Sequence, residues 1–312
     1  MSAAIDWARG MLAQRGERLL GDAETIRSYP WSTVTRLATD RGDVYLKEVA
    51  PAFAVELSLL PVLSEWFPGK VPEFLAIDFV QRRLLMADAG VPLRESLKAR
   101  FETAPLAAAL ALCAGIQHGT VERVETLLSL GLADWRLARL PALYRSLLED
   151  VPGLATAEID GLCALAPRVE ALCARLAACG VPETIEHCDF HDNNVLVRDG
   201  RMVIADWGDA VVSHPFLSLA SCLDSAGWNH GLTDAASDPL VDAYLSVWAG
   251  FGTRERLMEA ARLARRLRPI LVALNFRRVA AGGAGYADVM IERLRAFLAA
   301  ERLTSGPGLG YA

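Results

Sequence analysis

The stretch HCDFHDNN at residues 187–194, together with IADWGDA at residues 204–210, contains the densest group of polar side chains in the sequence. Between them, NVLVRD and RMVIAD are short apolar segments joined by Asp199-Gly200, a pair typical of tight hairpin turns. We therefore expect two paired strands here. The hairpin would bring the two polar stretches together at one end.

Two oxygen-bearing side chains meet at that end of the predicted hairpin. Folding the second strand back places Asp206 beside Asn194. A carboxylate and an amide oxygen on adjacent strand ends suit Mg²⁺, which takes one or two protein carboxylates and fills its other positions with water and phosphate oxygens. Asp189, earlier in the same loop, is then placed to accept or orient a hydroxyl proton.

The two stretches resemble a known pair of motifs. They are similar to the His-Gly-Asp-x4-Asn and Ile-Asp-Trp segments of the aminoglycoside phosphotransferase and choline kinase branch of the protein-kinase-like fold. The resemblance implies an enzyme that uses ATP and Mg²⁺ to phosphorylate a hydroxyl group. It implies that Asp189 orients the acceptor, and that Asn194 and Asp206 hold Mg²⁺ across the phosphates.

The first third of the sequence fits the same resemblance. The segment VYLKE places Lys47 on a predicted strand, where the family uses a lysine to hold the α- and β-phosphates. Its helix partner would be Glu56 in AVELSLLPVL, with Glu65 as the second choice.

The segment LLMADAG at residues 84–90 resembles the hinge between the two lobes of that fold. The resemblance implies that the hinge backbone hydrogen-bonds adenine, from Met86 through Ala87 to Asp88. The motifs of the family extend from about residue 24 to residue 225, and the helical remainder is similar only in character.

The sequence departs from the family at two positions. The loop that covers the phosphates corresponds to SYPWST at residues 28–33, which contains no glycine, so Ser32, Thr33 or their backbone amides would have to provide that cover. The family also has an aspartate in an Asp-Leu-Ala segment that anchors the catalytic loop. SHPFLSLA places Ser218 there, which puts anchoring by a carboxylate in doubt.

The segments outside the motifs indicate two parts. TVTRLATD (33–40) and DVYLKEV (43–49), joined by Arg-Gly, predict an antiparallel pair, and two more short strands follow a helix expected at 52–67. From Val91 onward, segments rich in alanine and leucine predict helices. The expected helices are 92–101, 104–118, 135–148, 156–178, 254–279 and 286–302.

The fold class is therefore α+β, and the resemblance makes it protein-kinase-like, with a small antiparallel β N-lobe and a larger, mainly helical C-lobe. We expect a β-rich nucleotide-binding lobe at 1–88, a mainly helical catalytic and acceptor-binding lobe at 89–303, and a flexible tail at 304–312.

Composition excludes several classes of protein. The 312 residues include 32 Lys and Arg against 38 Asp and Glu, and a net charge of −6 offers no basic surface for nucleic acid. The six cysteines form no CxxC pair and are too sparse for a disulfide framework. Since no apolar run approaches the roughly 20 residues that span a bilayer, we expect no membrane partner. The N-terminus predicts an amphipathic helix instead of a secretory signal, and a cytoplasmic location.

Two other chemistries are conceivable at the polar loop. His187 and His191 lie four residues apart, as zinc ligands do on a helix, but the segment predicts a loop that enters a strand. The resemblance makes His187 structural, packed under the loop. Cys188 lies beside Asp189, yet no base is better placed for a thiol than for the aspartate, so we interpret it as a packing residue.

The acceptor is expected to be a small polar compound that carries a hydroxyl group, and quite possibly a cation. Asp192 and Asp209 flank the predicted metal site, and Asp224 is a weaker candidate for the same role. The resemblance permits aminoglycosides, choline or ethanolamine, homoserine and sugars. Neither the acceptor itself, the preference for ATP over GTP, nor the oligomeric state can be assigned from the sequence.

A second hypothesis is a kinase-shaped nucleotide-binding module with little or no turnover. The glycine-free loop and Ser218 favour it. The joint presence of the lysine, the loop aspartate and the two metal ligands argues against it, because a module without catalysis has no physical need for all four. A protein kinase is disfavoured because no Ala-Pro-Glu segment follows Asp206.

Overall fold

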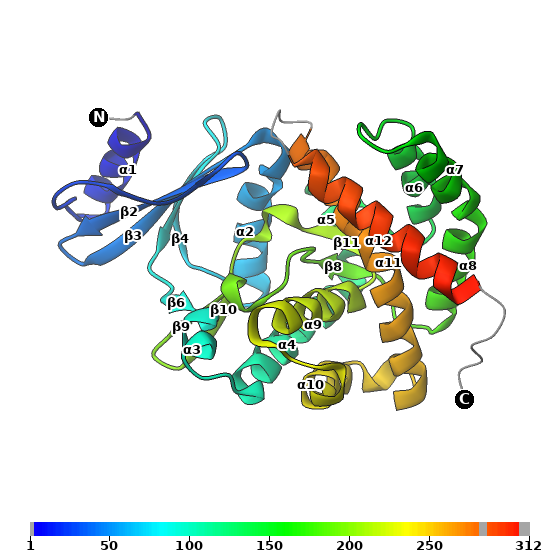
Figure 1. The fold of residues 1–312 in the computed structure, drawn as a ribbon. Helices are drawn as coiled ribbons and strands as arrows, with labels where there is room; N and C mark the ends of the chain where they lie inside the picture. Colours follow the sequence, from blue (N-terminus) through cyan, green and yellow to red (C-terminus); the bar gives the residue numbers. More distant parts are fainter. Residues whose placement is uncertain (1–2, 281–285, 306–312) are drawn as a thin grey trace.

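The computed structural model describes residues 3–280 and 286–305. Figure 1 shows an antiparallel sheet with one helix packed on its outer side, followed by a larger, mainly helical part. The predicted α+β class is therefore confirmed. Of the predicted tail at 304–312, residues 304 and 305 belong to the last helix, and 306–312 lie outside the described residues.

The N-terminal sheet has five antiparallel strands in the order β1-β2-β3-β5-β4. The predicted pair of strands is present, and Gly42 begins the second of them with a φ of 120°, a conformation that favours glycine. The strands are β1 (Glu24–Tyr29), β2 (Ser32–Thr39), β3 (Gly42–Val49), β4 (Phe74–Asp78) and β5 (Arg83–Ala87).

Each face of this sheet packs against one helix. The N-terminal helix α1 (Ala3–Gln14) buries Ala4, Ala8 and Leu12 against apolar side chains of β2, β3 and β5. On the opposite face lies α2 (Val55–Trp66), which begins three residues later than predicted, after a 3₁₀ turn, and continues through Pro61 to Trp66.

The rest of the chain is mainly helical and encloses most of the apolar core. The single helix predicted at 156–178 is two helices that meet at Leu165, and the short helix α5 was not predicted. The helices are α3 (Leu93–Ala99), α4 (Thr103–His118), α5 (Val124–Ser129), α6 (Leu140–Leu148), α7 (Thr156–Ala164), α8 (Ala166–Ala178), α9 (Phe216–His230), α10 (Asp238–Val247), α11 (Arg254–Ala280) and α12 (Ala287–Ser305).

No described helix is by itself long and apolar enough to cross a bilayer. By length and composition alone, α4 and α5 taken together, with a 44° bend between them, pass the same test.

Two small sheets contain the strands that flank the two polar loops, 187–194 and 205–210. The predicted hairpin is present as β9 (Val195–Arg198) and β10 (Arg201–Ile204), and β6 (Val91–Pro92) pairs with β9. The second sheet has the order β7-β11-β8, with β7 (Ala133–Asp134), β8 (Thr184–Glu186) and β11 (Val211–Ser213). The loop 187–194 therefore begins at β8 and ends at β9, and the loop 205–210 connects β10 to β11.

Gly90 lies at the connection between the sheet and the helical part, where the chain passes close to β9. Its φ is +96°, and a Cβ atom placed there would lie 2.1 Å from the carbonyl oxygen of Val197. A backbone oxygen in a paired strand cannot move aside without breaking the strand pairing. Only glycine therefore fits this connection.

We expect Gly90→Ala to lower the free energy of unfolding by more than about 2 kcal/mol, because it adds a backbone clash to the cost of a left-handed conformation. Gly69→Ala is the matched control, since Gly69 has a φ of +70° but no atom within 4 Å of the added Cβ. Urea denaturation of both variants measures the difference. Equal losses would show that the contact with β9 adds nothing.

Candidate active site

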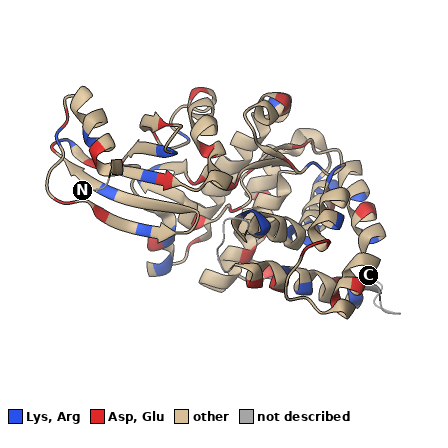
Figure 2. Ribbon diagram, turned by 90° about the horizontal axis from the view of Figure 1, so that it is seen from above, with Lys and Arg blue, Asp and Glu red and all other residues tan. Residues whose placement is uncertain are grey.

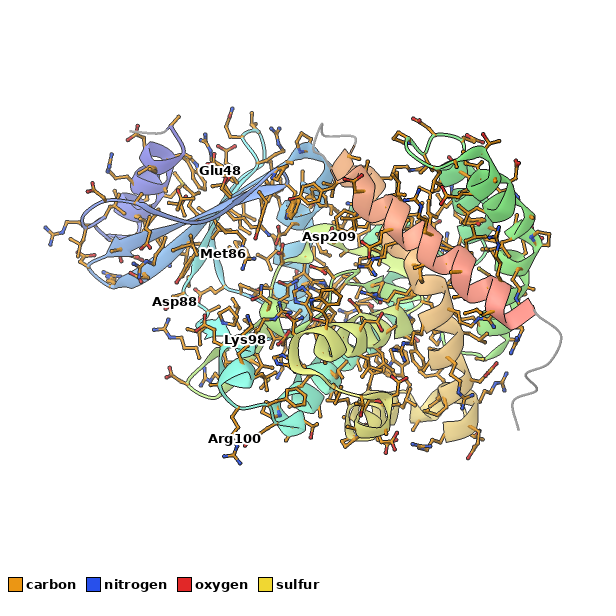
Figure 3. The ribbon with its side chains drawn as sticks, in the orientation of Figure 1. Glu48, Met86, Asp88, Lys98, Arg100 and Asp209 are labelled. Atoms are coloured by element: carbon orange, nitrogen blue, oxygen red, sulfur yellow. The ribbon has the colours of Figure 1, made fainter. Side chains whose placement is uncertain are left out.

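A cavity of about 400 Å³ lies between the N-terminal sheet and the helical part. It is lined by side chains from the sheet, α2, the connection at 89–92, the loop that ends at Asn194, and the turn at 205–207. Figure 3 labels Met86 on the sheet side of this region and Asp88 at the connection below it. We call this cavity the interlobe cleft.

Lys47 joins three elements at the inner end of the cleft. Its side chain is 6% exposed, and its Nζ lies 2.6 Å from Oε2 of Glu56 on α2 and 2.7 Å from Oδ1 of Asp206. Burial would lower the pKa of Lys47, but the two carboxylates, first Asp206 and then Glu56, hold that pKa above its usual value. The lysine is therefore charged, and Glu56 is the helix residue that contacts it.

Asp206 is the other charged residue that Lys47 fixes in place. Its backbone has a φ of 64°, and its side chain is 31% exposed. Burial would raise its pKa, but Lys47, and more weakly His187 and Arg27, hold the pKa of this carboxyl below its ordinary value. A charged carboxylate that still reaches solvent is a suitable ligand for a hard cation.

Asn194 lies next to this carboxylate because the hairpin is paired to its end. The backbone N–H of Ala205 donates to the carbonyl oxygen of Asn194 at 2.8 Å. The Nδ2 of Asn194 donates to the backbone oxygen of Asp189 at 2.9 Å and to its Oδ2 at 3.3 Å. Both amide hydrogens thus point at Asp189, which leaves the amide oxygen of Asn194 available to a cation.

Asn194 and Asp206 together fit Mg²⁺, which needs few protein ligands when phosphate and water complete its shell. Among the described residues, no group of three or more His, Cys, Asp and Glu could hold a metal ion. A cage made entirely of protein ligands is thus not present in that part of the chain. The available ligand set suits a metal that is shared with a phosphorylated ligand.

Asp189 lies beyond Asn194 and is the most open of these acids, with 48% of its side chain exposed. The partial burial of Asp189 would raise its pKa. The imidazole of His191 has the opposite effect and holds the pKa of Asp189 below the usual value, because its Nε2 lies 3.3 Å from Oδ2 of Asp189. The carboxylate is therefore ionised and accessible. It can accept a hydrogen bond from a hydroxyl group that enters the cleft.

The zinc and thiol interpretations find no support in this geometry. The Nε2 of His187 lies 3.0 Å from the backbone oxygen of Ala205, and its buried ring packs against Trp207 and Phe190. Burial raises the pKa of the Cys188 thiol well above its usual value, so it is not a ready nucleophile. His187 supports the loop from below, as the family resemblance implied.

A carboxyl group that was not predicted from the sequence anchors the loop. Glu186 is fully buried at the end of β8, and its oxygens accept hydrogen bonds from the Ser218 Oγ at 2.8 Å, the Cys188 N–H at 3.1 Å and the Ser218 N–H at 3.2 Å. The Nε2 of Gln117 donates to it at 3.1 Å. The anchor that Ser218 puts in doubt is thus supplied by the carboxyl group of Glu186, from the loop side.

Asp192 and Asp224 do not form the free acidic surface that we expected for a cationic acceptor. Asp192 is buried and contacts both Arg94 and His230 at 2.7 Å. Asp224 lies 2.7 Å from Arg268 and 3.2 Å from another arginine of α11. Arg94 neutralises Asp192, and two arginines of α11 neutralise Asp224. Figure 2 shows acidic and basic segments close together through the helical part, in keeping with this pairing.

Asp209 is the third acid predicted to contact the acceptor, and it lies near enough to Asp189 and Asp206 for their charges to affect it. The Nδ2 of Asn275 donates to its carboxylate at 2.6 Å. Burial, together with the charges of Asp189 and Asp206, raises the pKa of Asp209 to about 7. Of the three acids proposed for acceptor binding, Asp209 alone has no ion pair with a described residue.

The nucleotide side of the cleft differs from the expectation in two places. Ser32 lines the cleft, whereas Thr33 lies on the opposite face of the sheet, where its hydroxyl is 3.3 Å from that of Ser28. Met86 and Ala87 line the cleft, but the carboxylate of Asp88 turns outward to Arg198, and its backbone oxygen accepts a hydrogen bond from the same arginine at 2.8 Å. The Thr33 hydroxyl and the Asp88 carboxylate therefore do not face the cleft, and a role for the backbone of either residue stays a prediction.

Other cleft residues were not found from the sequence. Tyr45, Leu196 and Ala89 line its walls, and Arg27 enters from β1. Alternation along β3 would have identified Tyr45, because it lies two residues before Lys47 and so on the same face. Arg27 could not be found in this way, because the pairing of β1 is irregular.

The sequence model described as "Phosphotransferase enzyme family" matches residues 48–260, which is more than half of the chain. Among curated proteins, none matches this sequence.

Several solved structures share the fold. One is a choline/ethanolamine kinase family protein from Mesorhizobium loti, with 19% identity, 97% of this chain and 96% of that chain covered, and a TM-score of 0.62. A choline kinase from Cryptosporidium parvum has 11% identity, 96% of both chains covered and a TM-score of 0.66. The GDP complex of aminoglycoside 2'-phosphotransferase-IIIa has 15% identity, 96% and 100% coverage and a TM-score of 0.63. These likenesses confirm the protein-kinase-like fold.

The buried Glu186 gives a prediction about stability. Burial raises the pKa of Glu186 to about 8, so the folded protein holds this proton more tightly than the unfolded chain does. The stability due to this group is complete below pH 4.5 and is lost as the pH rises toward 8, at up to about 1.4 kcal/mol per pH unit. The parent should therefore lose its advantage over Glu186→Gln between pH 5 and pH 8.

Urea denaturation at several pH values measures this change in the stability difference. Glu125→Gln, at a side chain that is 84% exposed, controls for the loss of a carboxyl group. A difference between parent and Glu186→Gln that is constant or grows with pH would contradict the raised pKa.

Proposed function

This chain belongs to the phosphotransferase enzyme family, and we propose that it is an ATP-dependent small-molecule kinase that transfers the γ-phosphoryl group to a hydroxyl of a small polar acceptor. The observation that carries the proposal is the contact of Lys47 with both Glu56 and Asp206, at the inner end of a cleft that also contains Asn194. The family itself supports transfer of a phosphoryl group to a hydroxyl.

The cleft residues would neutralise and position the phosphates. Lys47 would contact the non-transferred phosphates, and Glu56 would hold the lysine in place. Asn194 and Asp206 would hold Mg²⁺, which supplies charge neutralisation at the phosphate oxygens when it is bound. In such transfers the protein contributes mainly through position and charge, so a set of fixed and correctly charged side chains is what the reaction requires.

Asp189 would act on the acceptor. Its ionised carboxylate would accept a hydrogen bond from the hydroxyl and turn the oxygen lone pair toward the γ-phosphorus. A bond then forms between the acceptor oxygen and that phosphorus, the bond from phosphorus to the bridging oxygen breaks, and ADP leaves. The hydroxyl proton passes to Asp189 and then to solvent, so that atoms and charge balance.

One residue of the site bears on the charge of the acceptor. Asp209 is the one acid whose position supports contact with an ammonium group, since Asp192 and Asp224 are paired with cations. The acceptor class that we propose is therefore a small hydroxylated compound, with Asp209 as the candidate contact for any amine that it carries.

A panel of acceptors tests the proposal. ATP or GTP consumption would be measured with Mg²⁺ and with choline, ethanolamine, aminoglycosides, homoserine or sugars. We expect turnover that depends on both acceptor and metal. Nucleotide binding without turnover on a broad panel would favour the non-catalytic module.

We expect Asp189→Ala to reduce turnover by at least about 100-fold, because proton transfer by a positioned side chain contributes on that order. Nucleotide affinity should stay within about three-fold, since the carboxylate acts on the acceptor. Calorimetric titration with MgATP, alongside the rate assay, separates the two effects. Equal loss of binding and turnover in a folded variant would contradict the assigned role.

Asp206→Asn should remove most of the gain in nucleotide affinity that Mg²⁺ provides, because it removes the charged ligand of a hard cation. Titrations with ATP in the presence of Mg²⁺ and of EDTA measure that gain. Asp199→Asn is the matched control, since its side chain is 91% exposed in the hairpin turn. If Asp206→Asn distinguishes the two conditions as the parent does, Asp206 is not the metal ligand.

A further inference from the structure

The turn between β1 and β2 lacks glycine and is held in place by its surroundings. Trp31 stacks on Tyr29 with ring centroids 4.9 Å apart and meets Tyr286 of the helical part edge-on at 5.0 Å. The backbone oxygen of Trp31 accepts a hydrogen bond from Ala50 at 2.8 Å, and Pro30 has no N–H to offer. This turn is poorly suited to placing its backbone amides over the phosphates of a nucleotide. A different group would therefore have to contact those phosphates.

Strand β1 contains an irregularity that turns one cation toward the cleft. Thr25 pairs with Thr35, but the next pair is Arg27 with Val34, so Ile26 is an extra residue. In a regular strand Arg27 would lie opposite Thr33 and point to the face covered by α1. A bulge of this kind redirects the following side chain, and here both Ile26 and Arg27 line the interlobe cleft.

The shifted register places Arg27 in one row with Lys47. Val34 pairs with Arg27 on one side and with Lys47 on the other. Directly opposed residues of neighbouring strands project from the same face of a sheet. Two cations therefore project into the cleft from one row of the sheet, about 10 Å apart at the backbone because neighbouring strands are about 4.8 Å apart.

The two cations differ in their partners. Lys47 is neutralised by Glu56 and Asp206, whereas the guanidinium of Arg27 makes no hydrogen bond or ion pair with any residue in the part of the chain that the structure describes. Arg27 is also the least exposed residue of β1, in which every other residue is exposed. A partly buried cation that faces a cleft, with no hydrogen-bond or ion-pair partner among the described residues, is suited to an anionic ligand.

We propose that Arg27 contacts the terminal phosphates of the bound nucleotide, at the place where the glycine-free turn cannot cover them. The inference rests on the proposed function, because it takes a nucleotide to be the ligand of the cleft. The planar guanidinium offers two parallel donors to phosphate oxygens, which the point charge of a lysine cannot match.

Calorimetric titrations with ATP, ADP, AMP and adenosine test the proposal, each in the parent, Arg27→Ala and Arg27→Lys, with GTP as a second triphosphate. A hydrogen bond to a charged group contributes about 1.5–3 kcal/mol, so we expect Arg27→Ala to bind ATP about 10- to 100-fold more weakly. Binding of adenosine and AMP should change less than about two-fold, and Arg27→Lys should be intermediate.

Arg18→Ala is the matched control, because it removes one positive charge from the same lobe at a side chain that is 81% exposed and pairs with Asp40. It should leave all affinities unchanged, and thermal melting checks that each variant folds. Equal ATP affinity in Arg27→Ala and the parent would overturn the proposal while the proposed function survives. Equal weakening of adenosine and ATP would also overturn it. A parent that binds neither ATP nor GTP would overturn both.

Discussion

The pair of contacts that Lys47 makes with Glu56 and Asp206 is the constraint on which the rest of the site depends. Lys47 and Glu56 are almost completely removed from water, and each buried charge is tolerable only because oppositely charged partners contact it. They come from β3, from α2 and from the turn after β10. The register of the sheet, the docking of α2 and the pairing of the hairpin must all be correct at once, so the cleft and the fold are specified together.

The buried carboxyl group of Glu186 shows that an anchor can be supplied from a different place in the sequence. The family resemblance places an aspartate where this chain has Ser218, which on its own would leave the catalytic loop without an anchor. Glu186, at the end of β8, accepts hydrogen bonds there from the hydroxyl and the N–H of Ser218 on α9. One carboxyl group therefore lies between the loop and α9, where the buried N–H of Cys188 needs an acceptor.

Much of this fold could be predicted from the sequence, because its strong signals are local. The Arg-Gly and Asp-Gly turns predicted two hairpins, and the family resemblance pointed to Lys47, Asn194 and Asp206, which the structure brings into one cleft. The partners of Asp192 could not be predicted, since Arg94 lies 98 residues away along the chain. The direction of Arg27 could not be predicted either, because a single extra residue in β1 reverses the alternation from which a face is inferred.

The aromatic packing of the β1–β2 turn has a thermodynamic consequence. A glycine-rich loop samples many backbone conformations when it is empty and loses that freedom when a nucleotide binds. Here Trp31 lies between Tyr29 and Tyr286, and Pro30 restricts the backbone further, so most of that ordering occurs when the chain folds. Ligand association should therefore carry a smaller entropic penalty than in relatives with a mobile loop. The turn loses this conformational freedom when the chain folds, and the apolar contacts of the three rings offset the entropic cost to the free energy of folding.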